Sequence, residues 1–462
     1  MTAATPRLGA VSHWYADIGL PVVRRAALAG TVQADVAIVG AGYTGLWAAY
    51  YLKQAAPALS VVVLEKTFAG FGASGRNGGW LSGGFAWNHG TYARDSGPEP
   101  VRRMVRAMMG TVDEVIRVAD AERIDADIRR CDELLVATNP AQMARLKAEY
   151  AHRAAWGEAE RLFTLTAAET RARVAIPGAL GAMGVRGVAR IQPAKLVRGL
   201  ALAVERLGVT IHEDTEVTAL APGRVTTARG AVQATVILRC TEGFTATLPG
   251  LRRSWLPLNS AQIATEPLPQ AVWDRIGWDG HEILGDFDHT YCYCQRTRDG
   301  RITVGARGVP YRFGSRLDRD GTPDAETLRR LTAILHRHFP ATRGARIDHG
   351  WCGVLGVPRD WCATVGLDRD TGLGWAGGYV GVGVSTANLA GRTLADLALG
   401  RDSDLIALPW VNRRVRLWEP EPLRWLGLRA MYRLYAAADR HEARGGTPSR
   451  LAALGNRLTG RC

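Results

Sequence analysis

The stretch V-A-I-V-G-A-G-Y-T-G, Val36 to Gly45, decides the fold of this chain. A short β-branched, apolar run leads into a glycine-rich turn and then into a helical segment, which is the pattern of a buried parallel strand followed by a helix. Gly40 permits the tight turn, Gly42 lets the backbone approach a pyrophosphate, and Gly45 lets helix and strand pack closely. The pattern therefore predicts a βαβ unit with a dinucleotide at the helix N-terminus.

The second strand of this unit, predicted over Ser60 to Glu65, ends in an acid. Glu65 is placed to accept hydrogen bonds from ribose hydroxyls, and its negative charge argues against a 2′-phosphate and hence against NADP. A glycine motif between a strand and a helix, with an acid at the next strand end, is much more specific than the glycines alone. The predicted dinucleotide contacts of this unit are Gly40, Gly42, Tyr43, Thr44, Gly45, Glu65 and Lys66.

A second glycine-rich segment, G-A-S-G-R-N-G-G, follows soon after the acid. A dinucleotide whose second half is a large flat ring needs backbone close to that ring, so this segment favours flavin over nicotinamide. A solvated loop is the alternative reading. The residues predicted to contact the cofactor here are Gly72, Ala73, Ser74, Arg76, Asn77, Gly78 and Gly79.

A third glycine-rich segment, G-G-Y-V-G-V-G-V, opens a helix predicted over Val384 to Leu399. A helix N-terminus that faces a flavin would stabilise negative charge on the reduced ring. A loop that leads into a packed helix is the alternative. The predicted flavin contacts in this segment are Gly378, Tyr379, Gly381, Val382, Gly383 and Val384.

The composition is that of a folded protein of two or three domains. The chain has 462 residues, is 47% hydrophobic and carries a net charge of +14. The positive charge is almost entirely arginine spread along the chain, which argues against a nucleic-acid partner. The seven scattered cysteines show neither a disulfide framework nor metal-ligand spacing, so no metal is expected. No apolar run reaches the roughly 18 residues of a spanning helix and no secretory leader is evident, so we expect a cytoplasmic protein.

Periodicity predicts alternating helices and strands along the rest of the chain. The region from 401 to 462 is basic and helical, and Pro420 and Pro422 interrupt it. Helices are predicted near residues 100–125 and over 141–162, 192–207 and 384–399; strands over 133–138, 209–211, 216–220 and 232–239; and a hairpin over 291–295 and 301–305.

The three glycine-rich segments, in this order, resemble the flavin-dependent amine and amino-acid oxidases of the D-amino acid oxidase and sarcosine oxidase superfamily. Further stretches are most similar to the γ-glutamylputrescine oxidase-like group: H-W-Y-A-D at His13 to Asp17, I-A-T-E-P-L at Ile263 to Leu268 and W-C-G-V-L-G at Trp351 to Gly356. Two positions depart from that group. Val382 stands where the group has a histidine, and T-E-G-F-T at Thr241 to Thr245 stands where it often has T-N-A-Y-T, so the substrate does not carry over.

The resemblance implies an α/β plus α+β protein folded from interleaved segments. Its Rossmann-like FAD-binding domain, of the glutathione-reductase type, would take residues 1–98, 186–245 and 350–400. An antiparallel-sheet substrate domain would take residues 99–185 and 246–349, and residues 401–462 would form a C-terminal extension. The resemblance also implies FAD contacts at Val217 and Thr241 and a covalent flavin link through Cys352, for which a buried structural cysteine is the alternative.

The implied chemistry is hydride transfer from the carbon of a C–N bond to flavin N5, which gives an imine, then a carbonyl, with O₂ reduced to H₂O₂. This needs a small-molecule amine in neutral form and no dedicated base, in agreement with the lack of a nucleophile–base motif. Tyr291 and Tyr293 alternate onto one strand face, where they could meet the substrate. Arg307 could pair with a substrate carboxylate, and Trp80 follows the flavin loop; ordinary packing is the alternative for all four.

Two other functions stay open. The first is an amine dehydrogenase that passes electrons to a quinone or protein at a membrane surface, which the C-terminal extension could contact through Trp410, Trp418, Leu426 and Tyr432. The second is a flavin-dependent enzyme that modifies tRNA, which the net charge favours; but no continuous basic stripe with interleaved aromatic residues is evident.

Overall fold

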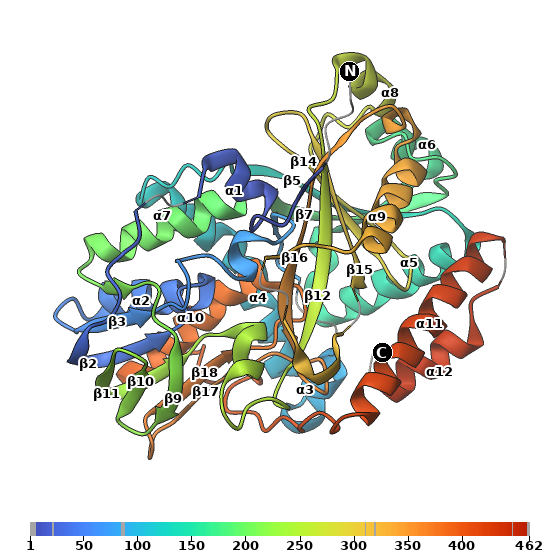
Figure 1. Ribbon diagram of the computed structural model, residues 1–462. Helices are drawn as coiled ribbons and strands as arrows, with labels where there is room; N and C mark the ends of the chain where they lie inside the picture. The colour runs from blue at the N-terminus through green and yellow to red at the C-terminus, as the bar shows by residue number, and fades with distance from the viewer. Residues whose placement is uncertain are drawn as a thin grey trace.

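The computed structural model describes residues 6–20, 23–84, 88–309, 311–317, 320–445 and 447–459, with the side chains of 307–309 and 457–459 outside that description. Two β-sheets form the framework (Figure 1). The first sheet and its helices fill the left half of the view. The second sheet stands at the centre, and the last two helices of the chain lie at the lower right.

The first sheet is the predicted dinucleotide unit, extended on both sides. The strand order is β17-β18-β11-β2-β3-β8, and the central pairs are parallel. The apolar end of β2, Val36 to Val39, is buried on both faces, as a central parallel strand requires. The strands are β2 (Gly30–Val39), β3 (Val61–Leu64), β8 (Thr210–His212), β9 (Val217–Ala221), β10 (Arg224–Thr227), β11 (Gly230–Arg239), β17 (Thr364–Asp368) and β18 (Leu373–Gly377).

The second sheet has ten strands, most of them antiparallel. Its order is β1-β16-β12-β15-β14-β13-β5-β7-β4, with β6 beside β7, and the pairs β1/β16 and β13/β5 are parallel. The strands are β1 (Arg7–Leu8), β4 (Trp80–Leu81), β5 (Arg129–Ala137), β6 (Leu162–Thr166), β7 (Gly181–Arg190), β12 (Leu256–Thr265), β13 (Ile283–Asp286), β14 (Cys292–Arg296), β15 (Ile302–Val309) and β16 (Ile347–Val357).

The domain boundaries inferred from the sequence differ from the sheet boundaries. The second sheet takes β1 and β4 from the segment 1–98, and the inferred boundaries at residues 186 and 350 fall inside β7 and β16. The sheet is also mixed and not purely antiparallel. The physical reason is that strand pairing joins segments far apart in the chain, so a pattern along one segment does not reveal which sheet it completes.

The helices cover the outer faces of the two sheets. One apolar cluster joins α2, α4, α7 and α10 to the first sheet, and another joins α8 and α9 to the second. The helices in the described part are α1 (His13–Ile18), α2 (Tyr43–Ala55), α3 (His89–Ser96), α4 (Pro98–Ala121), α5 (Pro140–Arg153), α6 (Ala167–Arg173), α7 (Pro193–Arg206), α8 (Gln270–Ile276), α9 (Ala325–His338), α10 (Gly383–Leu399), α11 (Leu423–Ala443) and α12 (Arg450–Thr459).

The predicted helix over 141–162 is shorter than expected. Helix α5 ends at Arg153, and a π-helical turn with Gly157 at φ +103° follows before β6 begins at Leu162. A left-handed glycine cannot continue an α-helix, so the chain turns there into the second sheet. The hairpin prediction is confirmed by the antiparallel pair of β14 and β15.

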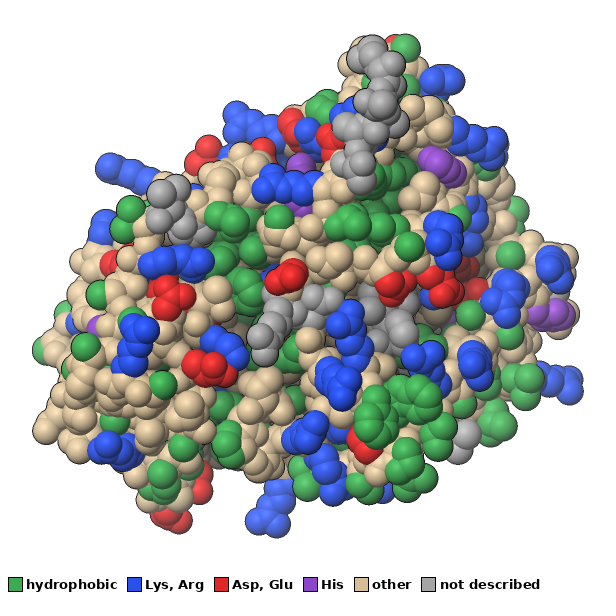
Figure 2. All heavy atoms as spheres, in the orientation of Figure 1, with side chains coloured by type: hydrophobic (Ala, Val, Ile, Leu, Met, Phe, Trp, Pro, Cys, Tyr) green, Lys and Arg blue, Asp and Glu red, His purple; other side chains and the backbone are tan. Residues whose placement is uncertain are grey.

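The C-terminal extension packs against the body of the protein. Trp410 is fully buried and Trp418 is 6% exposed, so two of the four side chains considered for membrane contact are enclosed; Leu426 is 52% exposed. Within the described ranges, no helix combines the length and the apolar character needed to cross a membrane. Lysine and arginine side chains are dispersed among acidic and apolar ones over the face shown in Figure 2.

Candidate active site

A cavity of about 1680 Å³ runs between the two sheets. One end lies at Glu65 and Val217 in the first sheet, and the other reaches the second sheet and α5. Pockets for drug-sized ligands span about 300–1,000 Å³. The cavity therefore has room for a dinucleotide together with a further small molecule.

The dinucleotide end is built on the glycine turn after β2. Gly40 has φ +104°, and a Cβ there would lie 2.7 Å from the Cys240 carbonyl oxygen. A Cβ on Gly42 would lie 3.0 Å from Ser74 Oγ, in the space between the turn and the second glycine segment. Gly42 caps α2 without a side-chain hydrogen bond of its own. Ser74 Oγ accepts from the Tyr43 N–H at 2.8 Å, and the other backbone N–H groups of the first turn are left for an anion.

The Glu65 carboxylate lies at the same end and braces the turn. Its Oε2 accepts from the backbone N–H of Ala41 at 2.9 Å and its Oε1 from that of Thr67 at 3.0 Å. Burial raises the pKa of Glu65, and the backbone N–H donors oppose that shift. Each carboxylate oxygen keeps a lone pair for a ribose hydroxyl. The cradle, the start of α2 and this acid fit an adenine dinucleotide such as FAD.

The second glycine segment is held mainly by its own hydrogen bonds. Arg76 Nε donates to the Phe71 carbonyl at 2.8 Å and its Nη1 to the Cys352 carbonyl at 3.2 Å. Asn77 Nδ2 donates to the Ser74 carbonyl at 2.8 Å, and Asn77 Oδ1 accepts from the Gly79 N–H. These side chains, predicted to meet the cofactor directly, shape the loop that lines the cavity.

The third glycine segment brings the start of α10 to the cavity. Gly381 (φ +99°), Val382 and Gly383 line it, and Val382 caps the helix without a side-chain hydrogen bond. Just before it, Tyr379 OH and Thr44 Oγ1 lie 2.8 Å apart, which ties this segment to α2. The N-terminus of α10 therefore lies at the cavity, and its contact with a flavin ring stays a prediction.

Glu242 is a cavity residue that the motif analysis did not assign. Its carboxylate accepts from the N–H groups of Gly378 at 3.0 Å and Tyr379 at 2.9 Å, and also from the N–H of Gly356. It stands in the T-E-G-F-T stretch, at one of the departures noted in the sequence. That departure was the signal in the sequence that could have identified Glu242, because an acid is uncommon at a buried turn.

The second sheet presents aromatic side chains to the cavity. Tyr293 OH lies 2.8 Å from Ser260 Oγ, and its ring fills the space beside Gly78 and Gly305. Trp80 donates its indole N–H to the Cys294 carbonyl at 3.1 Å and meets Tyr293 edge to face at 6.3 Å. Tyr291 also lines the cavity. Three of the four predicted substrate-side residues thus meet there; Arg307 lies in β15, with its side chain outside the described part.

Four predicted cofactor residues do not line the cavity: Gly45, Gly79, Gly378 and Cys352. Gly45 serves packing, because a Cβ there would lie 2.0 Å from the Gly40 carbonyl oxygen. Gly79 is also needed for packing, because a Cβ there would lie 2.4 Å from the Ile191 carbonyl oxygen. Gly378 donates its backbone N–H to the Glu242 carboxylate. Cys352 is 1% exposed in the apolar cluster on the α9 side, while its strand neighbour Gly353 lines the cavity.

The remaining predicted residues line the cavity as a group. They are Gly40, Gly42, Tyr43, Thr44, Glu65, Lys66, Gly72, Ala73, Ser74, Arg76, Asn77, Gly78, Val217, Thr241, Tyr379, Gly381, Val382, Gly383 and Val384. The far end holds charged residues that sequence reasoning missed, chiefly Glu133 of β5 and Glu149 and Arg153 of α5. For Glu133, the alternation of side chains along β5 was the only signal in the sequence. That signal is weak unless it is known which face of the strand other elements cover.

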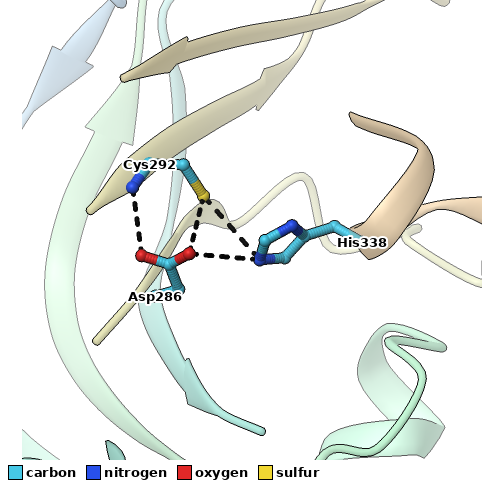
Figure 3. Close-up of side chains that lie close together, drawn as sticks. All are labelled: Asp286, Cys292 and His338. Carbon is cyan, nitrogen blue, oxygen red and sulfur yellow. Dashed lines mark hydrogen bonds and ion pairs between the residues drawn. The ribbon is translucent and has the colours of Figure 1, made fainter. Parts of the chain in front are cut away.

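Asp286, Cys292 and His338 form a buried cluster (Figure 3), and Asp286 and Cys292 line the cavity. Asp286 Oδ2 is 3.3 Å from His338 Nε2 and 3.3 Å from Cys292 Sγ. Arg337 Nη2 also reaches the same oxygen at 3.2 Å. With two cationic partners on Asp286, the cluster is an ion-pair anchor that fixes the end of α9 to β13 and β14.

A dinucleotide cradle joined by one cavity to an aromatic-lined sheet is the arrangement that a flavoprotein oxidoreductase needs. The family of FAD dependent oxidoreductases matches residues 35–397, and the chain belongs to it. It is 31% identical over 379 residues to gamma-glutamylputrescine oxidoreductase of Escherichia coli, covering 80% of this chain and 84% of that protein. The protein is therefore an FAD-dependent oxidoreductase.

Solved structures show the same fold. Glycine oxidase from Geobacillus kaustophilus superposes with a TM-score of 0.69 at 21% identity and covers 83% of this chain and 99% of its own. L-proline dehydrogenase from P. horikoshii superposes with a TM-score of 0.68 at 18% identity and covers 83% and 98%. The matched family region ends at residue 397, before α11 and α12.

Proposed function

We propose that this protein is an oxidase that removes two electrons from the C–N bond of a small-molecule amine and passes them to O₂, with formation of H₂O₂. The observation that carries the proposal is the single cavity that joins the dinucleotide cradle to Trp80 and Tyr293. When bound, the flavin supplies the hydride-accepting chemistry, and water then hydrolyses the imine product. The similarity to gamma-glutamylputrescine oxidoreductase supports an amine as substrate.

Side chains of the protein position the substrate and set the protonation state of its amine. Tyr293, held through Ser260, and Trp80, held through the Cys294 carbonyl, give the cavity a rigid aromatic wall. An apolar wall disfavours the protonated form of a bound amine and so favours the neutral form that can donate hydride. The N-terminus of α10 would stabilise negative charge on a flavin bound beside it.

The glutathione-reductase type of the FAD-binding domain also belongs to this proposal. It is supported by the parallel order β11-β2-β3-β8 and by the β9/β10 hairpin, which extends from β11. The division into an FAD-binding domain and a substrate domain is likewise proposed, with the strands assigned by sheet.

Anaerobic mixing of the purified flavoprotein with a panel of amines tests the function. The panel holds polyamines, N-methyl and D-amino acids, glycine, aminophosphonates and L-amino acids, and the visible flavin band is followed. We expect one class to bleach the band and air to restore it within seconds. Bleaching without rapid recovery in air indicates a dehydrogenase. No bleaching by any amine, in protein that binds flavin, contradicts the proposal.

The Gly42→Val variant supplies the control for this experiment. A Cβ at that position already approaches Ser74 Oγ to 3.0 Å, and the larger side chain fills the space that a pyrophosphate needs. We expect this variant to fold without flavin and to show neither the band nor its bleaching.

A further inference from the structure

The far end of the cavity holds a buried carboxylate that no protein group neutralises directly. Glu133 is 8% exposed and lines the cavity. Its neighbour Leu134 packs in the cluster on the other face of the sheet, while Leu135 lines the cavity, so strand alternation turns Glu133 inward. Throughout the described ranges, no hydrogen bond or ion pair reaches its carboxylate.

The charges around Glu133 leave this end of the cavity negative. Arg153 acts on Glu133 through its charge, but its Nη2 and Nε both donate to Glu158 Oε2, at 2.5 and 3.1 Å. The Glu149 carboxylate lines the same end and also has no hydrogen-bond partner within the described residues. Arg145 of α5 lines the cavity as well, but it donates to Glu442 at 2.7 Å. Arg153 is therefore left beside three carboxylates: Glu133, Glu149 and Glu158.

The two histidines at this end do not change that balance. His152 Nε2 and His89 Nδ1 lie 3.0 Å apart, and one of the two nitrogens must carry the shared proton. Burial lowers the pKa of His89 to about 3 and lowers that of His152 as well, so neither ring is charged at neutral pH. Burial also raises the pKa of Glu133 and of Glu149, as expected for acids that lack a counter-ion.

The wall between Glu133 and the aromatic site is apolar. A Cβ on Gly285 would lie 2.8 Å from Leu135 Cδ2 and 3.3 Å from the Trp80 ring, which places these two side chains side by side on the sheet. A chain of methylene groups fits such a wall, and an ammonium group fits the acids beyond it.

We propose that Glu133, assisted by Glu149, binds a second cationic nitrogen of the substrate, and that the preferred substrates are alkyl diamines or polyamines. This inference rests on the proposed function and specifies its substrate class. The reacting amine would lie by Trp80 and Tyr293, and the distal ammonium would supply the counter-charge that Glu133 lacks. A substrate with a carboxylate at the distal position would be repelled by the same acids.

Steady-state oxidation by the holoenzyme tests the proposal with matched pairs of an alkyl diamine and an alkyl monoamine of equal length. We expect wild type to prefer the diamine. In Glu133→Gln, kcat/KM for the diamine should fall by about 10- to 100-fold, the range for a buried charged hydrogen bond, and the monoamine should change by less than about twofold. Glu160→Gln, at an exposed glutamate outside the cavity, is the control and should match wild type.

Binding to the wild-type oxidised protein gives a test that needs neither turnover nor a folded variant. The flavin absorption band is titrated with a bis-quaternary alkyl diammonium and with its mono-quaternary counterpart. A quaternary ammonium donates no hydrogen bond, so the attraction between its charge and the Glu133 carboxylate should make the dication bind about 10-fold tighter or more. Equal binding of the two probes, or equal losses for diamine and monoamine in Glu133→Gln, overturns the inference even if the protein is an amine oxidase. Tighter dication binding without oxidation of any amine supports this site and contradicts the proposed oxidase.

Discussion

At the residue scale, Glu242 joins three parts of the cavity wall. Its backbone has φ +43°, and its carboxylate accepts N–H groups from β16 and from the turn between β18 and α10. Burial raises the pKa of Glu242 from 4.5 to about 7, although the backbone N–H groups of Tyr379, Gly356 and Gly378 oppose that shift. A carboxylate at this position therefore couples the geometry of the turn before α10 to pH.

The substitution Glu242→Gln tests this coupling. A folded-state pKa above the unfolded value means that the folded protein binds the proton more tightly, so the contribution of Glu242 to stability falls as pH rises from about 4.5 to about 7. The free energy of unfolding of wild type minus that of Glu242→Gln, measured with saturating FAD, should decline across this window. Near pH 5 the neutral acid carries one O–H donor, as glutamine carries an N–H₂ donor, so the variant should match wild type within about 1 kcal/mol there and should be the more stable of the two above pH 7. A flat difference curve contradicts the role given to Glu242.

At the element scale, helices α11 and α12 form a wall of the cavity. Tyr432 of α11 and Asn456 of α12 line it, beyond the region that the family match covers. The buried Glu442 carboxylate fastens them: it accepts from Arg145 Nη2 of α5 at 2.7 Å, from the Ser449 N–H at 3.0 Å and lies 3.1 Å from His289 Nε2. The C-terminal extension thus closes one side of the cavity.

Breaking this anchor should loosen α11 and α12. Burial alone would raise the pKa of Glu442, but the hydrogen bonds from Arg145, Ser449 and His289 lower it to about 2. The contribution of Glu442 to stability is therefore present at pH values above its ordinary pKa of 4.5, and it is lost as pH falls toward 2. In Glu442→Gln we expect hydrogen exchange in 423–459 to show a local loss of about 3 kcal/mol at pH 7, with a higher KM for amines. The exposed Asp404→Asn, in the same extension, should match wild type; equal protection in both variants contradicts the anchor.

At the scale of the whole molecule, the two faces of the second sheet have different tasks. One face meets the cavity and the first sheet, and the other packs on α8 and α9. Cys352 lies on the helix-covered face, at 1% exposure, and burial on that face gives it the role of a core residue. A covalent link through its sulfur would require the strand to turn over.

FAD should therefore be bound without a covalent bond to Cys352. We expect acid precipitation to leave all the yellow colour in the supernatant, and Cys352→Ala to retain the wild-type ratio of flavin to protein. Its unfolding free energy should fall by about 1–2 kcal/mol, because a small buried side chain is shortened. If the colour stays in the wild-type pellet but appears in the supernatant of Cys352→Ala, then Cys352 does bind the flavin covalently and this prediction is wrong.

The sequence alone determined the dinucleotide unit and the cofactor class, and only the tertiary structure decided the substrate end. The turn at Gly40 and Gly42, the helix after it and Glu65 follow from local steric and hydrogen-bonding constraints, which neighbouring residues carry. Glu133, Glu442 and the face of Cys352 depend on which distant strand or helix covers each side of the second sheet. Side-chain alternation shows that a strand has two faces, but only packing between remote segments decides which face becomes a site.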